Sequence, residues 1–197
     1  MPARASGFKS PFGHVTRVRV ISVNVEQALS LIRTIPDYPK PGILFQDITP
    51  VLSNPAAFNT VVRALAEVDP ESSVVAGIEA RGFIFASAIA VAKGCGFVPI
   101  RKKGKLPFTT FSKQYGLEYG VDEIEIHTDA FAPGSKVLLV DDVLATGGTL
   151  VAAIELVKQA GGVVTDIAVL SEISFLGGRL RIAKHSPEVQ IHALISG

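Results

Sequence analysis

Two adjacent carboxylates, Asp141 and Asp142, follow four apolar residues and precede a loop of small residues. The loop is rich in glycine and threonine and comprises Ala145, Thr146, Gly147, Gly148 and Thr149. An apolar-periodic segment starts directly after it, so the order predicts a buried strand, an acidic strand end and the start of a helix. The free backbone N–H groups and the positive dipole end of a helix start suit a phosphate.

The two carboxylates would repel that phosphate, so they are placed to accept hydrogen bonds from a neighbouring diol or to lie near a metal ion. A ligand that carries a phosphate close to a vicinal diol is a ribose 5-phosphate. The alternative is an aspartate that only caps a helix in a parallel α/β protein. The aspartate pair alone favours capping, whereas both glycines and both threonines together favour phosphate binding.

A second anion site is predicted at Arg81, which follows an apolar strand at 73–78 and precedes Gly82 at the start of a helix. This arrangement is of the same physical type as the first site. The alternative is a surface ion pair between Arg81 and Glu79, which would contribute little stability. A basic cluster follows the next strand and contains Arg101, Lys102 and Lys105. Taken alone, such a cluster indicates a run of charged side chains that are exposed to solvent.

Strand and helix patterns alternate along the chain. Helices are expected at 24–36, 55–68, 82–93 and 148–160, and strands at 73–78, 97–101, 136–141, 163–170 and 189–195. A proline-rich loop is expected before residue 50, and a long loop or frayed hairpin at 102–121. The alternation predicts an α/β fold with a mostly parallel sheet and helices on both faces. Ligands of such sheets bind outside the C-terminal strand ends, where Glu79 and Asp141 fall.

The length of 197 residues favours one domain, expected at 24–197 after an N-terminal extension at 1–23 of unknown role. The basic, acid-poor extension is compatible with a transit peptide, but a disordered or edge-strand extension is favoured. The formal net charge of +1 gives no overall electrostatic basis for nucleic-acid binding. Cys95 is the only cysteine, which favours a reducing compartment, so we expect a cytoplasmic protein. No apolar run indicates a membrane span.

The run 137–149 resembles the phosphoribosyl-diphosphate (PRPP) binding signature of the type I phosphoribosyltransferases. Other segments resemble the base-covering hood, the pyrophosphate loop and the two halves of the mobile catalytic loop of adenine phosphoribosyltransferases, in the family's order. These segments are Asp37–Pro50, Glu79–Phe83, Arg101–Pro107 and Leu117–Gly120. The resemblance implies the type I phosphoribosyltransferase fold, with a small N-terminal hood at about 36–50 and a mobile loop at about 102–121.

The resemblance also implies purine salvage, in which the 5-phosphoribosyl group of PRPP passes to adenine and gives AMP and pyrophosphate. PRPP and AMP would be bound by Asp141, Asp142, Ala145, Thr146, Gly147, Gly148, Thr149, Glu79, Ala80, Arg101, Lys102 and Lys105. Adenine would be bound by Ile43, Leu44, Phe45, Gln46 and Ile173. The expected catalytic residues are Glu118, Tyr119 and Arg81.

In the family, the residue at Glu118 handles the purine proton when the loop closes, and the residue at Tyr119 helps to close it. The transition state would resemble an oxocarbenium ion. Mg²⁺ would be bound with PRPP rather than in a permanent protein site. A cis peptide bond would fall between Glu79 and Ala80, and Arg101 would reach PRPP across the interface of a homodimer.

Two other functions stay open. A sister enzyme for a 6-oxopurine would need a lysine donor near the base, and no lysine stands among the residues expected there. A PRPP-sensing transcriptional regulator would need a nucleic-acid surface, which the net charge and the short extension disfavour. One departure from the family affects the base site, because Gln46 stands where many relatives carry arginine. Glutamine keeps hydrogen bonding but lacks the charge.

Overall fold

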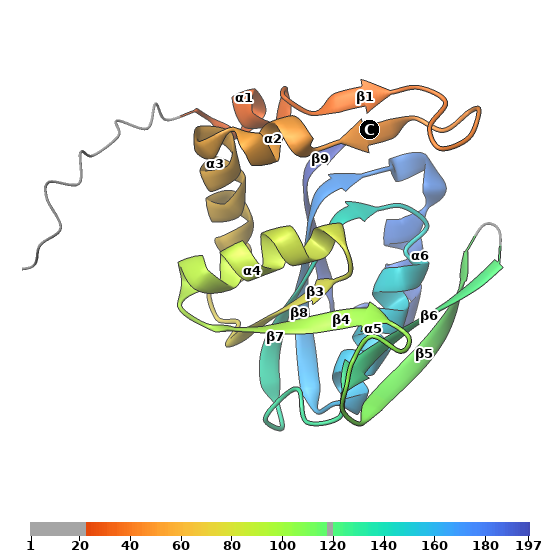
Figure 1. Cartoon of the computed structure of the whole chain (residues 1–197). Coiled ribbons are helices and arrows are strands. Elements are labelled where there is room, and N and C mark those ends of the chain that lie inside the picture. The colour runs from red at the N-terminus through yellow and green to blue at the C-terminus, as the bar shows by residue number, and fades with distance from the viewer. Residues whose placement is uncertain (1–22, 118–119) are drawn as a thin grey trace, which may run out of the picture.

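The structure is a computed structural model that describes residues 23–117 and 120–197 (Figure 1). Its central sheet has seven strands in the order β5-β6-β4-β3-β7-β8-β9. Their bounds are β3 Val74–Ile78, β4 Gly96–Lys102, β5 Thr110–Leu117, β6 Gly120–His127, β7 Ser135–Leu144, β8 Gly162–Glu172 and β9 Gln190–Ser196. Strands β4, β3, β7, β8 and β9 pair in parallel, while β5 and β6 form an antiparallel hairpin beside β4. The mostly parallel sheet is therefore confirmed.

Helices cover both faces of the sheet (Figure 1). One face packs against α1 (Val25–Leu29), α2 (Thr49–Ser53), α3 (Pro55–Ala66) and α4 (Arg81–Lys93). The other packs against α5 (Gly148–Gln159) and α6 (Gly178–His185), and a 3₁₀ turn spans Ser174–Leu176. Within the described residues, no helix has the length and apolar character needed to cross a membrane.

Strand β7 shows why its apolar run is buried on both sides. Val137 and Leu139 pack into the core beneath α5, whereas Leu138 and Val140 pack into the core beneath α3 and α4. All four side chains are completely buried. Because successive side chains of a strand point to opposite faces, a continuous apolar run fits only a strand covered on both faces. This central position brings the end of β7 to the middle of the sheet edge.

A small two-stranded sheet, with β1 (Arg33–Ile35) antiparallel to β2 (Phe45–Asp47), overlaps the segment expected to be the hood, and we call this sheet the hood. The expectation of one helix over 24–36 is wrong in part. The helix begins as expected, with Asn24 and Gln27 forming a capping box, but it ends at Leu29. Residues 33–35 instead pair with β2, and an ion pair of 2.7 Å between Arg33 and Asp47 joins the two strands.

The long segment 102–121 is largely a hairpin rather than a loop. Strand β5 pairs with β6 from Thr110 opposite His127 to Leu117 opposite Gly120. Ile124 and Ile126 alternate with polar residues and are buried in the core beneath α5. This period-two pattern is the signal for a half-buried strand, and it outweighs the many loop-forming residues nearby.

Helix α4 lies so close to β3 that only glycine fits at position 77. A Cβ atom at Gly77 would lie 2.5 Å from Cβ of Ala86 and 3.0 Å from the ring of Phe97. We expect Gly77→Ala to lower the free energy of unfolding by about 1–3 kcal/mol, because the packed core must shift to admit a methyl group. Urea denaturation would measure this loss. Gly96→Ala is the matched control, since nothing lies within 4 Å of its Cβ position, and an equal loss in both variants would contradict the packing argument.

Candidate active site

The predicted phosphate loop connects β7 to α5 at the edge of the sheet. It spans residues 145–147, between the last residue of β7 and the first residue of α5. Gly147 has φ of 75°, a left-handed conformation that favours glycine. No side chain caps the first turn of α5. The loop therefore presents a helix start whose N–H groups have no side-chain acceptor, as phosphate binding requires.

The paired carboxylates lie within β7 and not at its end, because the strand continues to Leu144, three residues beyond the end expected at Asp141. Asp142 is buried, and its backbone N–H donates to Oδ1 of Asp141 over 2.9 Å. Burial, followed by the charge of Asp142, raises the pKa of Asp141 well above its usual value. Burial also raises the pKa of Asp142, although the Arg81 guanidinium opposes this. Both side chains carry oxygen atoms that can accept hydrogen bonds from hydroxyl groups.

Arg81 pairs with Asp142 and not with Glu79, so the ion pair considered from the sequence is wrong. Its Nη2 atom lies 2.8 Å from Oδ2 of Asp142. The same guanidinium lies 5.1 Å from the centre of the Phe45 ring, and its Nη1 donates to the backbone oxygen of Gln46 over 3.3 Å. Arg81, the first residue of α4, therefore links the carboxylate pair to the hood.

Glu79 instead holds the basic cluster. Its carboxylate accepts hydrogen bonds from Lys105 Nζ at 2.6 Å, from the backbone N–H of Lys102 at 3.1 Å and from Arg101 at 3.2 Å. Burial acts to raise the pKa of Glu79, but these hydrogen bonds outweigh it and lower the pKa from 4.5 to about 2. The peptide bond between Glu79 and Ala80 is cis, as the resemblance implied. The Lys102 side chain points elsewhere and pairs with Asp122.

The residues expected to bind adenine lie on the hood and beyond β8. Phe45 and Gln46 belong to β2, while Ile43 and Leu44 precede it with exposed side chains. Gln46 Oε1 is buried and has no hydrogen-bond partner among the described residues. Ile173 follows β8, and its N–H donates to the backbone oxygen of Leu144 over 2.9 Å, next to the phosphate loop.

Two expected catalytic residues, Glu118 and Tyr119, lie outside the described residues. The hairpin that leads to them is fastened to α5 by an ion pair between Lys113 and Glu155. Sequence reasoning overlooked Glu125, which is buried and accepts hydrogen bonds from the backbone N–H groups of Lys105 and Leu106 at 3.0 and 2.9 Å. Glu125 positions the basic segment, and its only sequence signal is an acidic residue within an apolar alternation.

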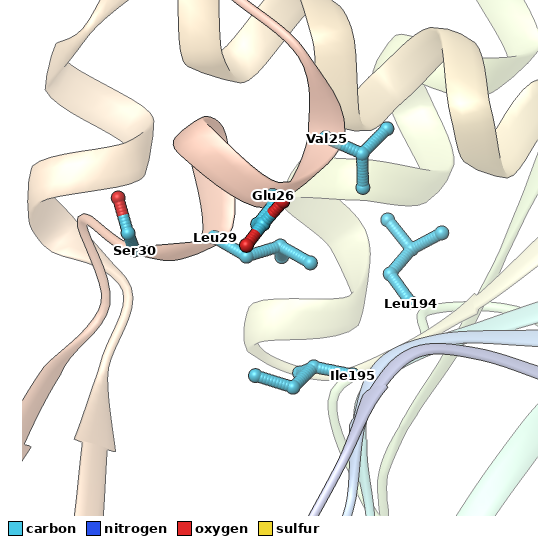
Figure 2. A pocket seen from close by; sticks show the side chains of 6 residues that line it. All are labelled: Val25, Glu26, Leu29, Ser30, Leu194 and Ile195. Atoms are coloured by element: carbon cyan, nitrogen blue, oxygen red, sulfur yellow. The ribbon is translucent and has the colours of Figure 1, made fainter.

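A cavity of about 550 Å³ lies between α1 and the end of β9, and its lining side chains can be seen in Figure 2. Its lining is mostly apolar and consists of Val25, Glu26, Leu29, Ser30, Leu194 and Ile195. None of these residues was expected to bind a substrate, and none is a cation that could hold a phosphate. The cavity is therefore separate from the candidate site at the end of β7.

The fold and the site define the class of protein. Residues 48–173 match the family described as phosphoribosyl transferase domain. The chain belongs to the phosphoribosyltransferase family.

Within that family it groups with the adenine phosphoribosyltransferases. It is 54% identical over 165 residues to the adenine phosphoribosyltransferase of Thermobifida fusca, which covers 83% of this chain and 92% of the relative. The adenine phosphoribosyltransferase structure from Thermoanaerobacter pseudethanolicus has a TM-score of 0.82 and 46% identity, covering 88% of this chain and 100% of that one. The Giardia lamblia enzyme, solved with 9-deazaadenine, has a TM-score of 0.82 and 40% identity, covering 89% and 99% of the two chains.

The hydrogen bonds of Glu79 predict a contribution to stability that depends on pH. Its pKa of about 2 in the folded protein lies below the ordinary 4.5, so its ion pairs stabilise the fold above about pH 4.5 and are lost as the pH falls toward 2. We expect the free energy of unfolding of the wild type to fall more steeply over this range than that of Glu79→Gln, as measured by urea denaturation. Glu188→Gln, which removes an exposed carboxylate, is the control. Parallel curves for the wild type and Glu79→Gln would contradict the assignment.

Proposed function

We propose that this protein transfers the 5-phosphoribosyl group of PRPP to adenine and releases AMP and pyrophosphate. The observation that carries this proposal is the phosphate loop placed directly beyond the Asp141–Asp142 pair on β7. One strand end thereby offers partners for both the phosphate and the diol of a ribose 5-phosphate. The adenine phosphoribosyltransferases to which the chain is similar support adenine as the base.

We assign three parts of PRPP to three parts of the site. The 5-phosphate binds the loop 145–149, and the ribose diol donates hydrogen bonds to Asp141 and Asp142. Pyrophosphate binds the turn 79–81 and the basic cluster of Arg101, Lys102 and Lys105. Arg81 and the cluster are already paired with carboxylates of the protein. Substrate binding therefore requires each of these cations to leave its carboxylate for a substrate anion, or to bind the carboxylate and the substrate anion at the same time.

Adenine binds between the hood and the turn after β8. Phe45 offers an aromatic face for stacking, Ile43, Leu44 and Ile173 supply apolar contact, and Gln46 contributes hydrogen-bonding groups. This proposal rests on the nearness of Phe45 and Gln46 to Arg81 and on the position of Ile173 beside the phosphate loop.

In the reaction, the bond from C1 of the ribose to pyrophosphate breaks and the bond from C1 to N9 of adenine forms. Positive charge develops on the ribose, giving an oxocarbenium-like transition state, while negative charge leaves on pyrophosphate. Glu118 accepts the proton that N9 loses, and Tyr119 helps to exclude water from the reactive cation. Arg81, Arg101 and Lys105 stabilise the charge on the leaving group.

Magnesium bound with PRPP supplies further neutralisation of the pyrophosphate charge. The donor set of the site suits it, since Asp141 and Asp142 offer the oxygen atoms that Mg²⁺ prefers. We also propose a homodimer in which Arg101 reaches the partner's substrate, a role that requires Arg101 to leave Glu79 of its own chain. A cytoplasmic location fits the single free cysteine, Cys95.

The proposed reaction is tested by measuring pyrophosphate release with PRPP, Mg²⁺ and one purine base at a time. We expect release with adenine and none above background with hypoxanthine, guanine or xanthine. Release with a 6-oxopurine alone would move the protein to a sister activity. Binding of PRPP without release from any base would contradict catalysis and favour a regulatory protein.

The assignment of the diol predicts the behaviour of Asp142→Asn. This change removes the charge that accepts hydrogen bonds from the ribose, so we expect KM for PRPP to rise about tenfold or more and kcat to fall. Steady-state kinetics would measure both, with thermal unfolding to verify that the variant is folded. Asp129→Asn changes an exposed aspartate and is the matched control. Unchanged PRPP kinetics in folded Asp142→Asn would remove the diol assignment.

A further inference from the structure

Helix α6 packs directly against the back of the phosphate loop. A Cβ atom on Gly178, the first residue of α6, would lie 2.2 Å from the backbone oxygen of Ala145. A Cβ atom on Gly147 would likewise lie 2.8 Å from the backbone oxygen of Gly178. The two glycines therefore bring the backbones into contact, and this contact fixes the position of α6 relative to the loop.

One face of α6 continues this contact along α5. Ile182 is completely buried in the core beneath α5, and His185 lies 2.9 Å from Glu155 of α5. Arg181 is three residues beyond Gly178, so its side chain leaves the same face of the helix. Its Nη1 atom lies 3.2 Å from the position that a Cβ atom on Gly148 would take. Arg181 thus holds its guanidinium beside the first residue of α5.

Among the described residues, no carboxylate pairs with Arg181, although its neighbours Arg179 and His185 on α6 have such partners. Arg179 binds the carboxylate of Glu172 through two nitrogen atoms, at 3.1 and 2.6 Å, and His185 pairs with Glu155. Among the residues that the structure describes, the Arg181 side chain makes no hydrogen bond or ion pair, and only its backbone N–H donates, to the oxygen of Gly177 over 3.1 Å. The Cβ position of Gly148 also lies 3.2 Å from the backbone oxygen of Gly116, so the guanidinium stands where α5 meets β5.

The phosphate loop also lacks a cation of its own. Residues 145–149 carry no charge, and the nearby Asp141 and Asp142 would repel a phosphate. Arg81 is paired with Asp142, while Arg101 is held by Glu79. A phosphate with two negative charges at the start of α5 therefore has backbone N–H groups and hydroxyl groups as partners but no side-chain charge from the loop.

We infer that Arg181 supplies this cation and binds the 5-phosphate of PRPP and of AMP. The inference deepens the proposed function and rests on it. A guanidinium beside a helix start can donate two parallel hydrogen bonds to a phosphate whose remaining oxygens face the loop N–H groups. Arg181 is a binding residue for the phosphate, distinct from the groups that meet pyrophosphate.

The test compares the two products as inhibitors, because only AMP carries the 5-phosphate. In Arg181→Gln we expect the inhibition constant of AMP to rise about tenfold or more, in line with the loss of a charged hydrogen bond, and that of pyrophosphate to stay within about twofold. Arg181→Lys keeps the charge but cannot donate two parallel hydrogen bonds, so it should recover only part of the AMP affinity. Lys184→Gln, one turn further along α6 and exposed, is the matched control, and thermal unfolding verifies each fold.

Three outcomes would overturn the inference while leaving the proposed function intact. These are unchanged inhibition by AMP in Arg181→Gln, equal weakening of AMP and pyrophosphate, and no recovery in Arg181→Lys. The equal weakening would indicate that Arg181 only supports the structure between α6 and α5. Wild-type protein that forms no AMP from adenine and PRPP would instead overturn the proposed function, and the inference with it.

Discussion

The buried carboxylate of Asp142 is the constraint on which the site depends. An uncompensated charge at the end of a buried strand is costly, so the fold must bring a cation to it. Arg81 meets this need from the first residue of α4 and reaches Phe45 and Gln46 of the hood with the same guanidinium. One charge compensation thereby fixes the relative positions of the central strand, a helix start and the hood.

The pairing of Glu79 with Arg101 and Lys105 follows the same principle on the neighbouring strand. Each group assigned to pyrophosphate is held by a carboxylate of the protein, so the site is internally neutralised. A polyanionic substrate then competes with carboxylates that are already in place. Such competition favours a ligand that offers a phosphate, a diol and a pyrophosphate together over a simple anion that replaces one partner.

The sequence was sufficient to predict most of β7, the glycine-rich loop after it and the start of α5, because a doubly buried strand and a glycine-rich helix start are local patterns. The partner of Arg81 could not be predicted, since Glu79 is near it along the chain whereas Asp142 meets it only across β3 and β7. The early end of α1 depends on the pairing of β1 with β2, which is also non-local. Arg181 was overlooked for the same reason: nothing in its neighbourhood along the chain marks a phosphate, and only the packing of α6 brings it there.

The contact between Gly147 and Gly178 limits how this protein could be made more thermostable. Replacing glycine by alanine commonly stabilises a protein by reducing the entropy of its unfolded chain, provided that the native conformation accepts a side chain. Gly147 is excluded by its positive φ, and Gly178 by the backbone that would meet its methyl group. Neither glycine can be replaced to restrict the unfolded chain, so folding must lose the full conformational entropy of a glycine at both positions. This entropy cost follows from the close packing of α6 against the phosphate loop.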